Sequence, residues 1–199
     1  GAWDIQVLER FAQVLNEAHR RLVDLGALAA GRRLAEEQLK LDLGLQQVRN
    51  QVLRMEGEGE LENVVLVFYY ELQHLMEFED CSLNLVDLQR GRMRRYIVDK
   101  SYEVVLRTAP LPLVVRKAME EGTSIYRPNR SHPLFGEELA WPINSVLDAP
   151  FSGGTVAINS PKEDAFSPRD VQILERFAQV LNEAHRRMED LRSLALQKE

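Results

Sequence analysis

The chain has 199 residues, of which 45% are hydrophobic, and it carries a formal net charge of -6 at pH 7. This hydrophobic content predicts a globular protein with a core, while the acidic balance argues against nonspecific nucleic-acid binding, which depends on a surplus of Lys and Arg. The longest apolar run, residues 64–70, is far shorter than a bilayer requires. Cys81 is the only cysteine, so no disulfide can form within the chain. We therefore expect a cytoplasmic protein with neither a nucleic acid nor a membrane as partner.

The two ends of the chain carry nearly the same sequence. Residues 4–25 return as residues 170–191 with 18 of 22 positions identical. Three of the four differences, such as Leu22 against Met188, exchange apolar side chains of similar volume, which a packed core tolerates. We interpret the repeat as the terminal helix of one unit followed by a complete second unit. An engineered copy of the helix is the alternative.

Residues 4–56 are expected to be almost entirely helical, because apolar side chains recur with the alternating spacing of a heptad seam. The first seam comprises Leu8, Phe11, Leu15, Ala18, Leu22, Leu25 and Ala29. The second seam has a different heptad phase and comprises Leu41, Leu45, Val48, Val52 and Met55. The change of phase near Gly31 predicts a kink, a stutter or a short break in the helix there.

The middle of the chain, residues 57–166, alternates between helical and strand patterns. We expect a buried helix at residues 61–78 and a short one that follows Pro112 and ends at Gly122. Strand patterns occupy residues 81–88, 93–98, 123–126, 143–149 and 155–160, and residues 127–142 are loop-like. Ser167 and Pro168 are typical of a helix start, so a closing helix follows them.

This order of elements resembles the GAF domain family of small-molecule sensing modules. The resemblance is most specific in Gly154-Thr-Val-Ala-Ile-Asn-Ser-Pro161, which leads through Ala165-Phe166-Ser-Pro-Arg-Asp170 into the closing helix. It implies an α+β fold, with an antiparallel sheet of about five or six strands, helices packed on the sheet, and long N- and C-terminal signalling helices. Residues 45–191 would form the GAF-like domain. Residues 1–44 would be the terminal helix of a preceding repeat with a connector, and residues 192–199 the start of a linker.

Specialised branches of this family need residues that the chain has only in part. The motif of cyclic-nucleotide-binding members is matched by Asn159, Phe166 and Asp170, but its Lys and Glu are missing. The free-methionine-sulfoxide-reductase branch relies on several redox cysteines, whereas Cys81 stands alone and opens a strand. No catalytic constellation and no set of metal ligands is recognisable. We therefore expect a module that is not an enzyme, and no cofactor is indicated.

In domains of this kind, ligands are held on the sheet face opposite the main helices. Period-2 alternation puts Ser82 and Asn84 on one face of the first strand, so this polar pair would point into a pocket or to solvent. The further candidates for ligand contact are Tyr96, Tyr126, Arg130, His132 and Asp148. The loop at residues 127–142 could close over an anionic ligand, and His132 could act as a haem ligand.

The helices give the main functional prediction, since an apolar helix face with heptad spacing is stabilised by packing against a partner helix. We expect a parallel homodimer that passes shifts of helix register between neighbouring GAF-like or output domains of a signalling protein. The predicted dimer seam comprises Leu8, Phe11, Leu15, Leu22, Leu45, Val48, Val52, Leu174, Phe177, Leu181 and Met188. The alternative is a sensor in which a nucleotide, an anion or haem closes the loop 127–142. The orientation of the helices in the dimer and the identity of any ligand stay open.

Overall fold

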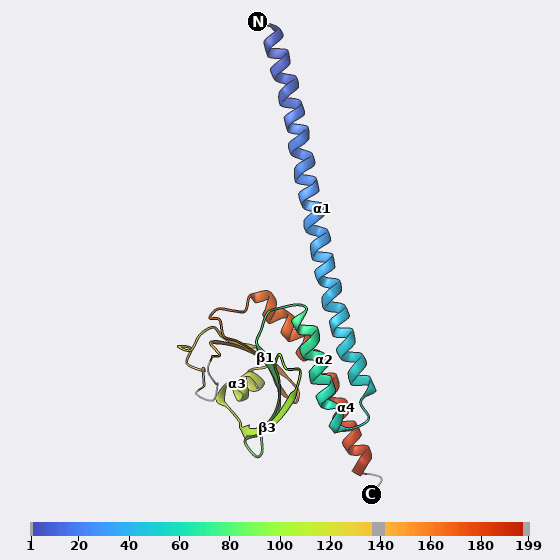
Figure 1. Ribbon diagram of the computed structural model, residues 1–199, viewed down its shortest axis with the longest axis vertical. Helices are drawn as coiled ribbons and strands as arrows, with labels where there is room; N and C mark the ends of the chain where they lie inside the picture. The colour runs from blue at the N-terminus through green and yellow to red at the C-terminus, as the bar shows by residue number, and fades with distance from the viewer. Residues whose placement is uncertain (1, 137–141, 197–199) are drawn as a thin grey trace. The chain divides into compact units, whose positions relative to one another are not determined.

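The computed structural model describes residues 2–136 and 142–196. The chain divides into two compact units, Gly1–Lys40 and Leu41–Glu199. The first unit consists of a single stretch of helix, and the second contains a sheet with helices on both faces (Figure 1). The helices are α1 (Ala2–Arg54), the short 3-10 turn η1 (Glu58–Glu60), α2 (Leu61–Gln73), α3 (Leu113–Glu121) and α4 (Pro168–Leu196).

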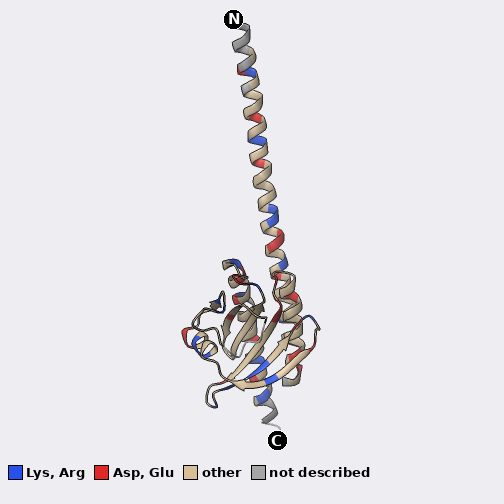
Figure 2. Cartoon of the chain, turned by 60° about the vertical axis from the view of Figure 1, so that its left-hand side comes forward, with Lys and Arg blue, Asp and Glu red and all other residues tan. Residues whose placement is uncertain are grey.

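Helix α1 runs from Ala2 to Arg54 without an interruption, so the predicted break near Gly31 is wrong. The neighbouring residues Leu28, Ala29, Ala30 and Arg32 are good helix formers, and one glycine costs only about 1 kcal/mol against alanine. Acidic and basic side chains are interspersed along the helix (Figure 2). The change of heptad phase therefore changes which side of the helix is apolar without ending the helix.

The six strands form one antiparallel sheet in the order β3-β2-β1-β6-β5-β4. This confirms the predicted fold class, a GAF-like antiparallel sheet with helices packed on it. The strands are β1 (Asp80–Asp87), β2 (Arg92–Val98), β3 (Val104–Pro110), β4 (Ile125–Arg127), β5 (Ser145–Phe151) and β6 (Gly154–Ser160). The sequence did not predict β3. This edge strand is mostly exposed on both faces, so its residues show no alternation between apolar and polar.

The two faces of the sheet are covered differently. Residues 41–54 of α1 and the adjacent Met55, together with α2 and α4, pack on the face that carries Leu83 and Leu85 of β1, and they form the main core with it. Helix α3 packs on the opposite face through Val114 and Val115, against Met93 of β2 (Figure 1). Alternate residues of β1 and β6 therefore face two separate interiors.

Two local features fix the last strand and the last helix. A Cβ atom on Gly154 would lie 1.8 Å from the backbone oxygen of Asn84, so only glycine lets β6 approach β1 at this point. Helix α4 begins with a reciprocal cap. The Ser167 backbone N–H donates to Asp170 Oδ2 at 2.8 Å, and the Asp170 N–H lies 3.3 Å from Ser167 Oγ.

Candidate functional site

A small polar cavity lies between the sheet and α3, and we call it the α3-side chamber. Its polar lining comprises Asn84, Arg95, Arg127, Asp148 and Asn159, and its volume is about 20 Å³. A cavity of this size holds about one water molecule. The polar residues come from β1, β2, β4, β5 and β6, so five strands of the sheet meet at this place.

A buried ion pair forms one wall of the α3-side chamber. The Arg127 side chain is 3% exposed and that of Asp148 is 2% exposed, and Arg127 Nη2 donates to Asp148 Oδ2 at 2.5 Å. Arg127 Nη1 also donates to the Leu134 carbonyl at 3.3 Å, which ties the loop after β4 to the sheet. Two charges buried at this depth hold one another in place, because either one alone would carry a large desolvation cost.

Polar side chains from β1 and β6 continue this lining on the same face of the sheet. Asn84 donates to Thr155 Oγ1 at 3.0 Å, and Asn159 donates to Asp80 Oδ1 at 2.5 Å. Burial raises the pKa of Asp80 above its ordinary value, although the hydrogen bond from Asn159 and the nearby Arg95 act in the opposite direction.

Several polar atoms on this face are buried without a hydrogen bond within the described part of the chain. They are Ser82 Oγ, Asn84 Oδ1, Asn159 Oδ1 and Arg127 Nε. Buried polar atoms in folded proteins nearly always have a partner, so a cluster of exceptions on one face needs an explanation. The group offers three oxygens that can accept hydrogen bonds and two donors, the Ser82 hydroxyl and the Arg127 Nε–H, all shielded from bulk water.

Of the predicted ligand contacts, Ser82, Asn84 and Asp148 lie together on the α3 face. Tyr96 and Tyr126 do not, and their predicted position is corrected. Paired residues of antiparallel strands share a face. Tyr96 pairs with Leu83 and Tyr126 with Leu147, so both rings lie on the face covered by α1, α2 and α4. The Tyr126 hydroxyl accepts the Phe166 N–H there.

Arg130 and His132 make local contacts in the loop after β4. Arg130 Nε donates to Asn144 Oδ1 at 3.1 Å, and the Leu134 N–H donates to His132 Nδ1 at 3.2 Å. Neither residue lines the α3-side chamber. Part of the predicted closing loop, residues 137–141, lies outside the described residues.

Sequence reasoning missed Arg127, because the predicted strand 123–126 ended before it and residues 127–142 were predicted to be a loop, whereas β4 includes Arg127. Asn159 was considered only as part of a cyclic-nucleotide-binding motif. The other two residues of that motif, Phe166 and Asp170, stabilise the fold. Phe166 is buried against Tyr126, with ring centroids 5.9 Å apart, and Asp170 caps α4. The register between the strands, as the structure has it, places both missed residues on the α3 face.

The predicted dimer seam needs a larger correction. Leu45, Val48, Val52, Leu174, Phe177, Leu181 and Met188 are all buried in the main core of the chain itself. They cannot line a seam between two chains unless that core opens. Phe11, Leu15 and Leu22 are 63%, 55% and 69% exposed. The side chain of Leu8 lies outside the described residues.

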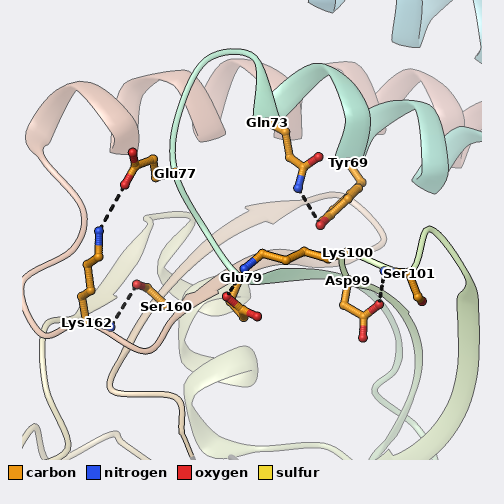
Figure 3. A network of polar contacts seen from close by, with 9 residues as sticks. All are labelled: Tyr69, Gln73, Glu77, Glu79, Asp99, Lys100, Ser101, Ser160 and Lys162. Carbon is orange, nitrogen blue, oxygen red and sulfur yellow. Dashed lines mark hydrogen bonds and ion pairs between the residues drawn. The ribbon is translucent and has the colours of Figure 1, made fainter.

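Polar contacts at the end of the sheet beneath α2 differ from the α3-side chamber in their exposure. Lys100 Nζ lies 2.7 Å from Glu79 Oε2, and Lys162 Nζ lies 3.2 Å from Glu77 Oε2 (Figure 3). These four side chains are 41% to 93% exposed. Exposed ion pairs contribute little stability, because water and salt screen them. We treat this network as surface structure, not as a site.

Known structures share this fold. A GAF domain from an Acinetobacter phosphoenolpyruvate-protein phosphotransferase is 19% identical, with a TM-score of 0.57, and the match covers 73% of this chain and 92% of that one. Residues 122 to 287 of a methyl-accepting chemotaxis protein are 15% identical, with a TM-score of 0.58 and coverage of 73% and 98%. The fold of this chain is therefore GAF-like. No protein-family model matches the chain, and no curated protein matches it in sequence.

The same fold also occurs in enzymes. The free methionine-R-sulfoxide reductase of Neisseria meningitidis, solved with its substrate, is 14% identical, with a TM-score of 0.59 and coverage of 73% of this chain and 88% of that chain. The expectation that the module is not an enzyme is corrected by this similarity, because the GAF-like fold itself accommodates catalysis. Cys81, the only cysteine, is fully buried, and burial raises the pKa of its thiol.

Proposed function

We propose that the chain is a sensory or regulatory module of a multidomain signalling protein, and that it forms a homodimer through the N-terminal part of α1. Its GAF-like fold supports the first statement, since domains of this fold come from a phosphotransferase and a chemotaxis protein. In the described part of the chain, no helix has the length and apolar character that a bilayer crossing requires.

One observation carries the proposed dimer. Phe11, Leu15, Leu22 and Leu25 are 55% to 69% exposed and follow heptad spacing, and we call them the α1 stripe. Large apolar side chains at this spacing on an exposed helix favour pairing with a second helix, because pairing removes their surface from water. The stripe replaces the longer seam predicted from the sequence.

The sheet provides a route by which the α3-side chamber and the helices could affect one another. Ser82 and Asn84 of β1 face the α3 side, while Leu83 and Leu85 pack in the core with residues 41–54 of α1. A displacement of β1 would therefore be felt on both faces, since closely packed interiors transmit strain. We propose that α1 carries such displacements toward neighbouring domains.

Light scattering tests the dimer directly. A monomer has a mass of 22.9 kDa, and we expect about twice this value at micromolar concentration. The variant Leu15→Asp should return the protein to the monomer mass, because it places a charge in the stripe. Gln13→Asp makes the same charge change at another exposed position of α1 and should leave the dimer intact. A monomeric wild type, or equal effects of the two variants, would refute the proposal.

Small-molecule binding in the α3-side chamber is a second candidate function. The buried atoms Asn84 Oδ1, Asn159 Oδ1 and Arg127 Nε belong to residues that line the chamber and favour it, because a polar ligand could satisfy all three. The present volume of about 20 Å³ means that a nucleotide or haem would require α3 and the following loop to move away. An anion would also compete with Asp148 for Arg127.

Native mass spectrometry of the purified protein tests this second function. We expect a small molecule that stays bound under gentle conditions and is released on denaturation. Replacing Asn84 and Asn159 by leucine should abolish the bound mass, while Gln13→Asp should retain it. A wild type without a bound mass, whose melting temperature also stays constant in the presence of nucleotides and small anions, would contradict the candidate.

A further inference from the structure

The repeated segment occurs once exposed and once buried. The described side chains Val7, Phe11, Val14, Leu15 and Leu22 of α1 are 55% to 69% exposed. At the equivalent positions of α4, the side chains Ile173, Phe177, Val180, Leu181 and Met188 are at most 3% exposed. The apolar side chains through which α4 packs in the main core are thus repeated in α1, where the described ones are exposed to solvent.

Helix α4 lies in a groove built from residues 41–54 of α1 with the adjacent Met55, from α2 and from the turn between β5 and β6, and we call this surface the α4 groove. The Phe177 ring meets the edge of the Phe68 ring with centroids 5.4 Å apart, and it also packs against Gly44. A Cβ atom on Gly153 would lie 2.3 Å from the ring of His185, so the turn admits this ring only because the position is glycine. Phe11 and His19 repeat these two side chains.

Polar contacts between α4 and the α4 groove use residues that the first copy also retains. Arg176 donates to Asp42 at 3.0 Å, and Glu183 accepts from Arg49 at 3.1 Å. The equivalents of these two α4 residues are Arg10 and Glu17. The charge pattern of residues 4–25 therefore complements the α4 groove as that of α4 does.

Two further contacts involve backbone groups of the groove. The Ser152 N–H donates to Asn182 at 2.6 Å, and Arg187 donates to the Met55 carbonyl at 3.2 Å. Asn16 and Arg21 are the equivalents of these α4 residues. At three positions the copies exchange one apolar side chain for another of similar volume, among Ile, Val, Leu and Met. The fourth difference is Val23, whose counterpart Glu189 is exposed.

We propose that residues 4–25 are a second, interchangeable α4, and that they occupy the α4 groove of a second copy of this chain when that chain's own α4 is displaced. The incoming helix restores the same apolar burial and the same ion pairs, so the exchange changes which chain supplies the helix and leaves the groove filled. In the undisturbed protein the tethered α4 has the advantage, because its effective concentration exceeds that of a helix from another molecule. The interaction surface is thus the α4 groove, and its partner is the N-terminal helix of another copy.

The test weakens each copy separately in the full chain. Phe177→Asp with Leu181→Asp puts two charges into the main core and should displace α4. We expect this variant to keep a cooperative thermal unfolding transition in circular dichroism, because residues 4–25 of another molecule fill the groove. Phe11→Asp with Leu15→Asp by itself disrupts the α1 stripe but should keep a cooperative transition, since α4 still fills the groove. The combination of all four substitutions should lose the transition.

A peptide of residues 4–25 provides the matched control. Added to the fourfold variant, the wild-type peptide should restore the transition in a concentration-dependent way, whereas the peptide with Phe11→Asp and Leu15→Asp should not. The proposal is overturned if the Phe177→Asp, Leu181→Asp variant unfolds as completely as the fourfold variant, or if the fourfold variant keeps its transition. Both outcomes are independent of the mass of the wild-type dimer, so the dimer proposal can fail or survive separately.

Discussion

Truncation of the same phenylalanine in the two copies of the repeat should have very different consequences. Phe177 is fully buried and meets Phe68 in the main core, while Phe11 is 63% exposed. Phe177→Ala removes a large side chain from a close-packed interior, which costs the transfer free energy of the ring and leaves a cavity. Phe11→Ala removes a ring that is mostly in water.

The expected magnitudes follow from these surroundings. Burial of this kind makes Phe177→Ala cost about 3 to 5 kcal/mol of unfolding free energy. In a unit of this size, each kcal/mol lowers the melting temperature by about 2 to 4 °C, so the shift should be about 6 to 20 °C. Phe11→Ala should stay within about 0.5 kcal/mol, as surface substitutions usually do.

Urea unfolding followed by circular dichroism measures both variants. Each should be measured at two protein concentrations that differ about tenfold, because the Phe11→Ala variant is expected to alter self-association and thereby any concentration dependence of the midpoint. Similar losses of stability for the two variants at both concentrations would refute the reasoning, since they would mean that the exposed copy contributes to a core as α4 does.

Three further predictions concern the buried ion pair, two glycines and Asp80. Arg127→Met should cost about 3 to 5 kcal/mol of unfolding free energy measured in urea, because it leaves the buried Asp148 carboxylate without its guanidinium. Adding Asp148→Leu should recover much of this loss. A double variant as unstable as the single one would contradict this. Gly154→Ala should lower the free energy of unfolding by about 3 kcal/mol or more, since its Cβ would clash with the backbone of β1. Gly31→Ala, with open space around it, should raise this free energy by up to about 1 kcal/mol. Similar melting temperatures of the two variants would refute the expectation. Burial raises the folded-state pKa of Asp80, so its contribution to stability is fully present below its ordinary pKa and is lost as the pH rises through the folded value. Asp80→Asn should therefore raise the melting temperature most near neutral pH, and this gain should disappear on acidification. Thermal melts across the acid range that show the opposite trend would contradict this prediction.

Strong periodicity made most of the fold predictable. Strand β1 alternates, and α1 and α4 have the heptad spacing that burial of one face imposes. Strands β5 and β6 are buried on both faces, and the paired glycines of the turn between them made this hairpin recognisable. The exposed edge strand β3 has no such asymmetry, and this is why the sequence did not reveal it. The dimer seam was misassigned for a related reason: a heptad pattern records that one face is covered, but the cover can be another part of the same chain.

The candidate site was partly predictable because strand alternation separates faces. It placed Ser82 and Asn84 on one face of β1, but the partners from other strands depend on register, which a single strand does not determine. A shift of one residue exchanges Tyr126 for Arg127, and the structure has Arg127 on the α3 face. The cavity volume and the unsatisfied polar atoms depend on packing across five strands and have no local signature in the sequence.

The repeat also gives the molecule an internal reference for amide hydrogen exchange. Intrinsic exchange rates depend on local sequence, and residues 4–25 and 170–191 are identical at 18 of 22 positions. Any difference in protection between the two copies therefore reports the effect of tertiary packing on a helix whose local chemistry is almost constant. Peptide-resolved mass spectrometry could read this difference within a single unmodified sample, without a mutant and without a second protein for comparison.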